Sequence, residues 1–316
     1  LLSTTDSYTY NTSILIYITV SPSESKIELK STYETAIFTV ILLPFRVIVI
    51  CYLIVTAWFL ACIGLYGLSE EDLRALKPLI CFIGKMSYLA GGMAITIRGR
   101  QASRKEAPIL VVAPHSSFLD SCIVYATKIP RHIPLLGKEL INYTQPVYVW
   151  RDDPNSRQNT IKEIIERATS KEDWPQVLIF PEGTCTNRSC LITFKPGGFY
   201  PGVPVQPVTI RYPNARDTVT WTWEGPGALK LLWLTLTQVH SSCEIEFLPV
   251  YYPSEEEKRD PKLYARNVRD VMAKALGVPV LDYTYDDCRL IARAKQLGIP
   301  CAASTREVSE IRGQLG

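Results

Sequence analysis

Residues 109–120 read ILVVAPHSSFLD, and this stretch decides the fold that we expect. Its first five residues are apolar and rich in β-branched side chains, which predicts a buried strand over Ile109–Ala113. Ser117 is a favoured helix N-cap residue, and Asp120 stands three positions later, where a capping box places its second side chain. A helix is therefore expected to begin here. A strand, a short loop and a helix in succession are the repeating unit of an α/β sheet.

Outward from this stretch, short apolar runs alternate with amphipathic, helix-like segments. Ser156–Ser170 places its isoleucines on one face of a helix. Pro261–Leu276 has Asp260 as N-cap, a proline at the first helical position and Gly277 beyond its end. We predict an α/β fold with a largely parallel sheet flanked by helices. The further predicted strands are Ile95–Arg98, Val147–Trp150, Val177–Phe180, Val205–Ile210 and Glu244–Val250.

His115 and Asp120 are the first candidates for chemistry. Five residues apart on a helix they would be separated by about 140° of rotation, so they cannot share one helical face. With His115 in the loop before the helix, its ring can fold back towards Asp120. A carboxylate that accepts from one ring nitrogen fixes the tautomer and leaves the other nitrogen as a base for a hydroxyl. The alternative is a capping Asp120 and an ordinary loop histidine; the position after a strand, where α/β sheets bind ligands, favours function.

A second strand, Val177–Phe180, runs into the turn Pro181-Glu182-Gly183-Thr184. The backbone N–H groups of such a turn and the Thr184 hydroxyl suit a phosphate or an oxyanion. Glu182 could order a cationic side chain or a substrate hydroxyl. A simple Pro-Glu-Gly turn without function is the alternative.

The N-terminal part contains one long apolar segment. Between Ala36 and Leu68 the only charged residue is Arg46, and Val47–Leu65 is a run of 19 uncharged residues. About 20 such residues can cross a hydrocarbon core about 30 Å thick, and the segment begins too far along the chain for a cleavable signal peptide. We expect one or more N-terminal membrane helices rather than a buried soluble helix. Because Pro44 and Arg46 divide the segment, one spanning helix and two short helices in one leaflet both remain open.

A further apolar and aromatic surface is expected from Trp221 to Trp223 and over Ala228–Val239. Residues of this kind are enriched where proteins meet the membrane interface. The alternative is a helix buried against the sheet.

The composition argues against several classes of function. The net charge of the 316 residues is +3, and no Lys/Arg stripe interleaved with aromatic residues occurs, so no nucleic-acid partner is expected. The nine cysteines include no CxxC pair, which argues against a zinc site, and we expect no metal. Reduced structural cysteines are expected instead. Cys185 is not expected to be a nucleophile, because no second histidine lies near it in the sequence.

Four blocks of sequence occur in the order and spacing of a known family. They are HSSFLD from residue 115, Arg151 after VYVW, FPEGTCTN from residue 180 and VPVQPV from residue 203. Together they resemble the glycerolipid acyltransferases related to bacterial 1-acylglycerol-3-phosphate acyltransferase. The segments YPNARDTVTWTW, PSEEEKRDP and YTYDDCRL are similar to the lysophosphatidylcholine acyltransferase branch, which includes the enzyme that acetylates lyso-platelet-activating factor. The resemblance covers about residues 36–300.

This resemblance implies an enzyme that transfers an acyl group to the sn-2 hydroxyl of lysophosphatidylcholine or lyso-platelet-activating factor. Acyl-CoA would be the co-substrate, and no tightly bound cofactor is implied. His115 would be the general base and Asp120 would orient it. Acyltransferases for lysophosphatidic acid or glycerol 3-phosphate remain open, as does a non-enzymatic membrane scaffold. The residues implied in substrate binding are Lys138, Arg151, Glu182, Gly183, Thr184 and Pro207.

The resemblance also implies membrane lipids as partners. It implies the endoplasmic reticulum membrane as the site of action, with the catalytic domain in the cytosol; the Golgi and the lipid-droplet surface are alternatives. The expected organisation is a polar segment over residues 1–33, a membrane-anchoring region over 34–97, an acyltransferase domain over 98–300 and a tail over 301–316.

Overall fold

A computed structural model describes residues 29–67, 70–120, 123, 155–172, 174–222, 225–284 and 287. The predicted strand Val147–Trp150 lies outside them. The described residues form a five-stranded sheet with the strand order β1-β5-β4-β2-β3. The bounds of the strands are Met93–Arg98 for β1, Ile109–Ala113 for β2, Val177–Ile179 for β3, Val205–Arg211 for β4 and Ser241–Phe247 for β5.

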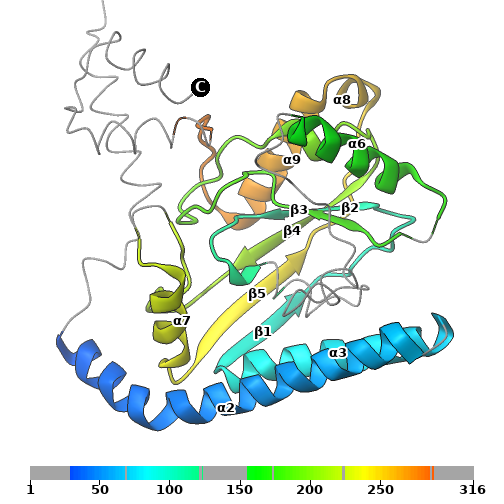
Figure 1. Ribbon diagram of the computed structural model, residues 1–316. Helices are drawn as coiled ribbons and strands as arrows, with labels where there is room; N and C mark the ends of the chain where they lie inside the picture. The colour runs from blue at the N-terminus through cyan, green and yellow to red at the C-terminus, as the bar shows by residue number, and fades with distance from the viewer. Residues whose placement is uncertain are drawn as a thin grey trace, which may run out of the picture.

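The sheet is mixed but largely parallel. β2 runs parallel to β3 and β4, and β1 runs parallel to β5. Only the junction between β4 and β5 is antiparallel. The predicted fold class is confirmed. Because β2, β3 and β4 point the same way, the loops that follow them meet at one edge of the sheet (Figure 1).

Two apolar cores cover the faces of the sheet. On one face, Ile109 and Val111 of β2 pack in a cluster with Tyr264, Val268 and Met272 of α9 (Pro261–Leu276). α6 (Ser156–Thr169) lies on the same face (Figure 1). The alternate residues of β2, Leu110 and Val112, belong to a second cluster on the opposite face. Since both faces are covered, every residue of β2 is buried, which explains its unbroken apolar run.

Local helix signals are found where the sequence predicts them. The Asp260 side chain accepts hydrogen bonds from the backbone N–H groups of Lys262 and Leu263 at the start of α9. Gly277 ends the helix in the left-handed conformation, with φ of 71°. The short helix α8 (Glu255–Arg259) precedes α9, and its N-cap is Ser254.

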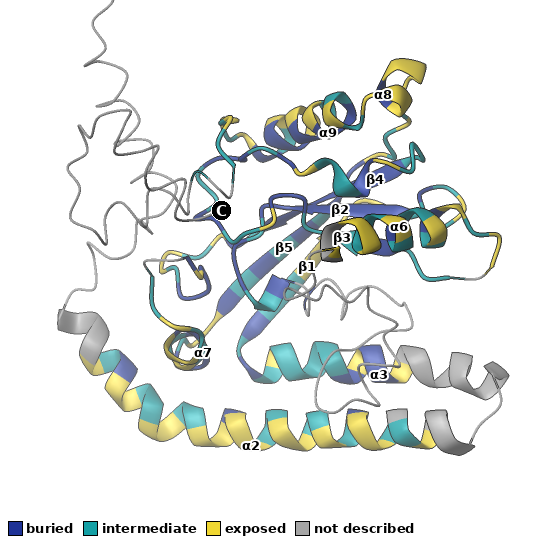
Figure 2. Ribbon diagram, turned by 45° about the horizontal axis from the view of Figure 1, so that its top comes forward, coloured by how far each residue is buried: buried dark blue, intermediate teal, exposed yellow. Residues whose placement is uncertain are grey.

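The apolar N-terminal segment forms one helix. α2 (Leu29–Gly67) continues through Pro44 and packs against α3 (Glu70–Ala90), which leads into β1. Of the two arrangements left open by the sequence, the structure has the single helix: α2 curves but does not break at Pro44 (Figure 2). Among the described residues, Tyr33–Leu60 is the one helix long and apolar enough to cross a membrane. Most of its apolar side chains are exposed (Figure 2).

Arg46 connects the middle of α2 to the sheet domain. Its guanidinium is buried and donates to the backbone carbonyls of Leu236 at 2.8 Å, Gln238 at 2.5 Å and Val239 at 2.9 Å. These carbonyls belong to the last residue of α7 (Ala228–Leu236) and to residues just beyond it, where a helix carries partial negative charge. Arg46, the only charge in the apolar segment, therefore attaches α2 to the sheet domain.

The sheet also begins earlier than the expected domain boundary. β1 is hydrogen-bonded to β5 from Met93 onwards, so these residues belong to the sheet domain rather than to the anchoring region that was expected to end at residue 97. The sequence predicted this strand as Ile95–Arg98, so only its first two residues, Met93 and Ala94, were missed.

Two glycines with positive φ allow a test of how closely the chain after β1 packs against the end of β5. Gly99 has φ of 77°, and a Cβ there would lie 2.1 Å from the carbonyl oxygen of Phe247. Gly277 has φ of 71°, with nothing within 4 Å of such a Cβ. Gly277→Ala should cost about 1 kcal/mol from backbone strain alone. Gly99→Ala should lower the free energy of unfolding by about 3 kcal/mol or more, because the clash is with backbone.

Urea unfolding of the two variants in the same detergent, followed by circular dichroism, measures this difference. Equal losses in the two variants would show that the chain at Gly99 moves freely away from Phe247.

Candidate active site

The candidate site lies where β2, β3 and β4 end. His115 follows β2 after Pro114, and Asp120 stands in the first turn of the next helix. The Nδ1 atom of His115 lies 3.0 Å from Oδ2 of Asp120, so the two side chains meet as predicted. The Ser117 hydroxyl accepts from the Leu119 N–H at 3.2 Å, and the Asp120 carboxylate accepts from the Ser117 N–H at 2.9 Å, which confirms the predicted N-cap.

Asp120 is fully buried and surrounded by donors. Besides His115, its Oδ2 accepts from the backbone N–H groups of Ser116 at 2.7 Å and Ser117 at 2.9 Å. Its Oδ1 accepts from the hydroxyl of Tyr212 at 2.5 Å. Sequence reasoning missed Tyr212. The available signal was its place directly after β4, at the same edge of the sheet as His115.

The imidazole of His115 is held on one side and open on another. Its ring stacks on Phe180 with 4.1 Å between centroids and 23° between planes. Its side chain is 20% exposed. With Nδ1 facing Asp120, the Nε2 atom has no hydrogen-bond partner among the described residues, and it is the nitrogen available for proton transfer.

Glu182 lies beneath the His115 loop rather than at an exposed surface. Its carboxylate is fully buried, faces the backbone N–H of His115, and accepts from the hydroxyl of Thr186 at 3.3 Å. Burial raises the pKa of Glu182 well above its ordinary value. Its Oε1 atom has no hydrogen-bond partner within the described part of the chain. The Thr186 N–H donates to the carbonyl of His115 at 2.7 Å, so this turn fixes the backbone of the histidine.

The remainder of the turn faces outward. Gly183 is exposed and has φ of 68°, and Thr184 is half-buried. A Cβ on Gly183 would lie 2.8 Å from Nζ of Lys195, so a lysine ammonium lies over the turn. Sequence reasoning did not single out Lys195, whose Phe-Lys-Pro context carries no motif of its own.

The other sequence candidates are placed as follows. Pro207 lies in the middle of β4, opposite Val111, and its carbonyl accepts from the Leu248 N–H at 3.0 Å, so it belongs to the sheet and not to a strand end. Lys138 and Arg151 lie outside the described residues.

Burial raises the pKa of the Cys185 thiol to about 12, which leaves it protonated at neutral pH and unsuited to act as a nucleophile.

A second cation lies behind Tyr212. Arg188 donates from Nη2 to Oδ2 of Asp217 at 2.6 Å, and its guanidinium lies 5.1 Å from the centroid of the Tyr212 ring. Sequence reasoning gave no role to Arg188, which directly follows the block FPEGTCTN.

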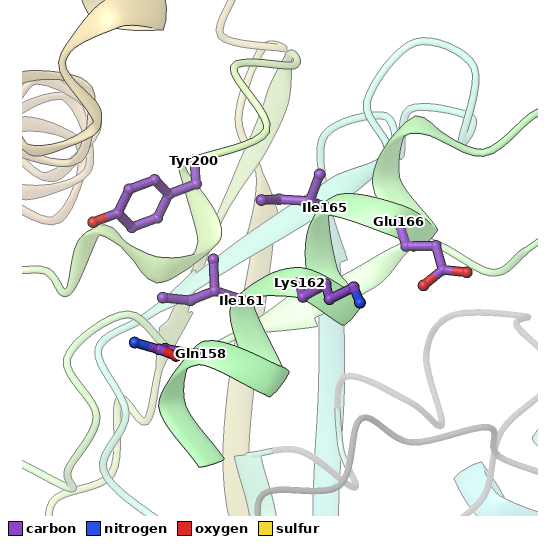
Figure 3. A pocket seen from close by; sticks show the side chains of 6 residues that line it. All are labelled: Gln158, Ile161, Lys162, Ile165, Glu166 and Tyr200. Atoms are coloured by element: carbon purple, nitrogen blue, oxygen red, sulfur yellow. The ribbon is translucent and has the colours of Figure 1, made fainter. Parts of the chain in front are cut away.

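An apolar hollow of about 540 Å³ lies elsewhere, on the outer side of α6 (Figure 3). Ile161 and Ile165 point towards Tyr200 across it, whereas Lys162 and Glu166 point away. Neither His115 nor Asp120 lines this hollow, so it is separate from the candidate site.

This arrangement can activate a hydroxyl. An oriented imidazole with a free nitrogen, a carboxylate that fixes its tautomer and a neighbouring turn with an ammonium group are the parts needed to deprotonate an alcohol beside an anion. The described residues near His115 offer no activated nucleophile of their own, because Cys185 is protonated.

Comparisons with known proteins agree with this geometry. A family model described as acyltransferase matches residues 94–211. The chain is 53% identical to a lysophosphatidylcholine acyltransferase of Drosophila melanogaster, over 95% of this chain and 60% of that protein. It is 49% identical to lysophosphatidylcholine acyltransferase 1 of Homo sapiens, over 90% of this chain and 56% of the relative.

The fold has a counterpart among solved structures. The crystal structure of the 1-acyl-sn-glycerophosphate (LPA) acyltransferase from Thermotoga maritima aligns with a TM-score of 0.50 and 18% identity, covering 76% of this chain and 98% of that one. The chain spans about 60% of the length of the curated relatives it matches. Across nearly its whole length, this chain is similar to lysophosphatidylcholine acyltransferases.

Proposed function

We propose that this protein transfers an acyl group from acyl-CoA to the sn-2 hydroxyl of a lysophospholipid, lysophosphatidylcholine or lyso-platelet-activating factor, to give a phosphatidylcholine and free CoA. The observation that carries the proposal is the His115–Asp120 pair, with Nδ1 bound at 3.0 Å and Nε2 left open. The relatives named as lysophosphatidylcholine acyltransferases support the choice of acceptor.

In this mechanism the acceptor hydroxyl attacks directly. Nε2 of His115 removes the hydroxyl proton as the oxygen bonds to the thioester carbonyl carbon. The carbon–sulfur bond then breaks, and the proton passes from the imidazolium to the departing thiolate. Asp120 stabilises the transient imidazolium and keeps Nε2 unprotonated in the resting enzyme. No acyl-enzyme is formed.

The phosphate of the acceptor is proposed to lie at the turn after β3. Lys195 lies over Gly183 there, and the exposed backbone of Gly183 allows close approach of an anion. Arg151 and Lys138 are proposed to complete this site, on the ground of their positions in the family motifs. The fully buried Glu182 is proposed to act by fixing the His115 loop.

α2 is proposed to attach the enzyme to a membrane, that of the endoplasmic reticulum with the sheet domain in the cytosol. Val40, Phe45 and Ile48 are 75%, 69% and 68% exposed, and leaving such apolar surface in water costs about 25 cal/mol per Å². α7 extends this surface, because Leu229 is 84% exposed and Trp233 donates to Thr39 of α2 at 3.0 Å. The expected surface is therefore supported for α7, while Trp223 lies outside the described residues.

Removal of the base should abolish transfer. His115→Ala is expected to lower kcat at least ~100-fold, because general-base catalysis contributes that much. Asp120→Asn should also be severely impaired, since the amide no longer selects the correct tautomer. His240→Ala is the matched control, because His240 is exposed and bonds only to Ser242 among described partners. Near-normal turnover of a folded His115→Ala protein would refute the mechanism.

The acceptor site can be tested at Arg151. Arg151→Ala should raise the Michaelis constant for lysophospholipid about 10- to 100-fold and leave that for acyl-CoA nearly unchanged, because a guanidinium pairs strongly with phosphate. Arg259→Ala, an exposed arginine on α8, is the control. A defect confined to acyl-CoA would assign Arg151 to the coenzyme instead.

Membrane attachment can be tested on the exposed face of α2. The double change Phe45→Glu and Ile48→Glu should abolish co-flotation of the full chain with phosphatidylcholine liposomes, because each carboxylate near the hydrocarbon costs about 2–3 kcal/mol. Tyr252→Glu serves as control, since this residue is 67% exposed and lies in the loop before α8. If both proteins float equally, α2 is not the attachment surface.

A further inference from the structure

The second oxygen of Asp120 is held by a residue far away in sequence. Oδ2 faces His115 and two backbone N–H groups of its own loop, whereas Oδ1 accepts from the Tyr212 hydroxyl at 2.5 Å. Tyr212 follows β4, which is hydrogen-bonded to β2. The carboxylate thus accepts hydrogen bonds from the segments that follow two neighbouring strands, β2 and β4.

We propose that Tyr212 is a positioning residue for catalysis: its hydroxyl fixes the Asp120 carboxylate and, through it, the orientation and tautomer of His115. The proposal rests on the proposed acyl transfer and assigns to it a residue that acts without touching the substrate.

The hydroxyl is well suited to this role because it stays a donor. Burial raises the pKa of Tyr212 well above its ordinary value, and the charge of Asp120 raises it further. A donor that never ionises in the working range leaves Asp120 as the acceptor. Three donors, from His115, Ser116 and Ser117, meet Oδ2, whereas Tyr212 is the one donor that the described residues supply to Oδ1.

The tyrosine ring is itself held in place. Arg188 lies 5.1 Å from the ring centroid, and Asp217 binds the guanidinium at 2.6 Å. Oδ1 of Asp217 accepts from the backbone N–H groups of Val219 at 3.1 Å and Thr220 at 3.0 Å. Cation–π contact and these bonds keep the ring from moving away from Asp120. A ring that only filled space would require neither the hydroxyl contact nor the cation.

The change Tyr212→Phe removes the hydroxyl and keeps the ring. Oδ1 would then be a buried acceptor with no donor among the residues that the structure describes, and the carboxylate could turn away from His115. We expect kcat to fall about 10-fold, with both Michaelis constants within about twofold of the wild type, since only the orientation of the base changes.

Tyr251→Phe is the matched control. Tyr251 also donates to a carboxylate, Oε1 of Glu257 at 2.6 Å, at the start of α8. It should lose thermal stability without losing kcat. A fall in kcat for Tyr212→Phe alone supports the proposal. Unchanged kcat, or a loss that tracks melting temperature equally in both variants, overturns it.

A second readout needs no substrate and separates this proposal from the proposed function. The full chain has three histidines, so nitrogen NMR of protein labelled with ¹⁵N-histidine can resolve His115 after comparison with His115→Ala. The wild type should show one tautomer, protonated at Nδ1, and Tyr212→Phe should show a mixture. A single unchanged tautomer in Tyr212→Phe overturns the positioning role even if acyl transfer is confirmed. A mixture in a protein without acyltransferase activity supports the positioning role and refutes only the proposed reaction.

Discussion

The buried carboxylate of Asp120 is the constraint on which the candidate site depends. An ionised carboxylate is costly away from water unless donors surround it. Here the donors come from the loop after β2 and from Tyr212, the residue that follows β4, so the charge is satisfied only when both strands stand in register. The loops are further tied together, because Thr186 donates to the His115 carbonyl and Trp221 donates to that of Ser116. The His115–Asp120 pair therefore depends on the same strand pairing that forms this edge of the sheet.

Features fixed by neighbours in sequence were predicted well. β2 was predicted with its observed bounds, because an apolar run ended by Pro114 has no other stable place than a covered strand. α9 was predicted from its cap residues, Asp260 and Gly277, which act within one turn of the helix. The meeting of His115 with Asp120 followed from the geometry of a loop and the first turn of a helix. The caps of α9 and the His115–Asp120 contact depend on interactions across five residues or fewer.

Features fixed by distant contacts could not be predicted. Tyr212 reaches Asp120 across 92 positions, and its place after a predicted strand does not by itself identify that partner. Glu182 was expected to face a ligand, whereas its place beneath His115 depends on how two loops cross. β5 begins at Ser241 and not at Glu244, since pairing with β1 from Met93 extends it beyond its apolar residues. The antiparallel pairing of β4 with β5 likewise has no local signal in the sequence.

Arg46 gives the N-terminal helix a mechanical role. Its three hydrogen bonds to the chain between α7 and β5 lie near the midpoint of α2, so sliding or rotation of the helix would leave a buried guanidinium without partners. A helix fixed in this way holds one orientation relative to the sheet domain. With α2 in the membrane as proposed, the height and tilt of the sheet edge above the lipid surface are set by the packing of α2, and His115 meets each acceptor from the same direction.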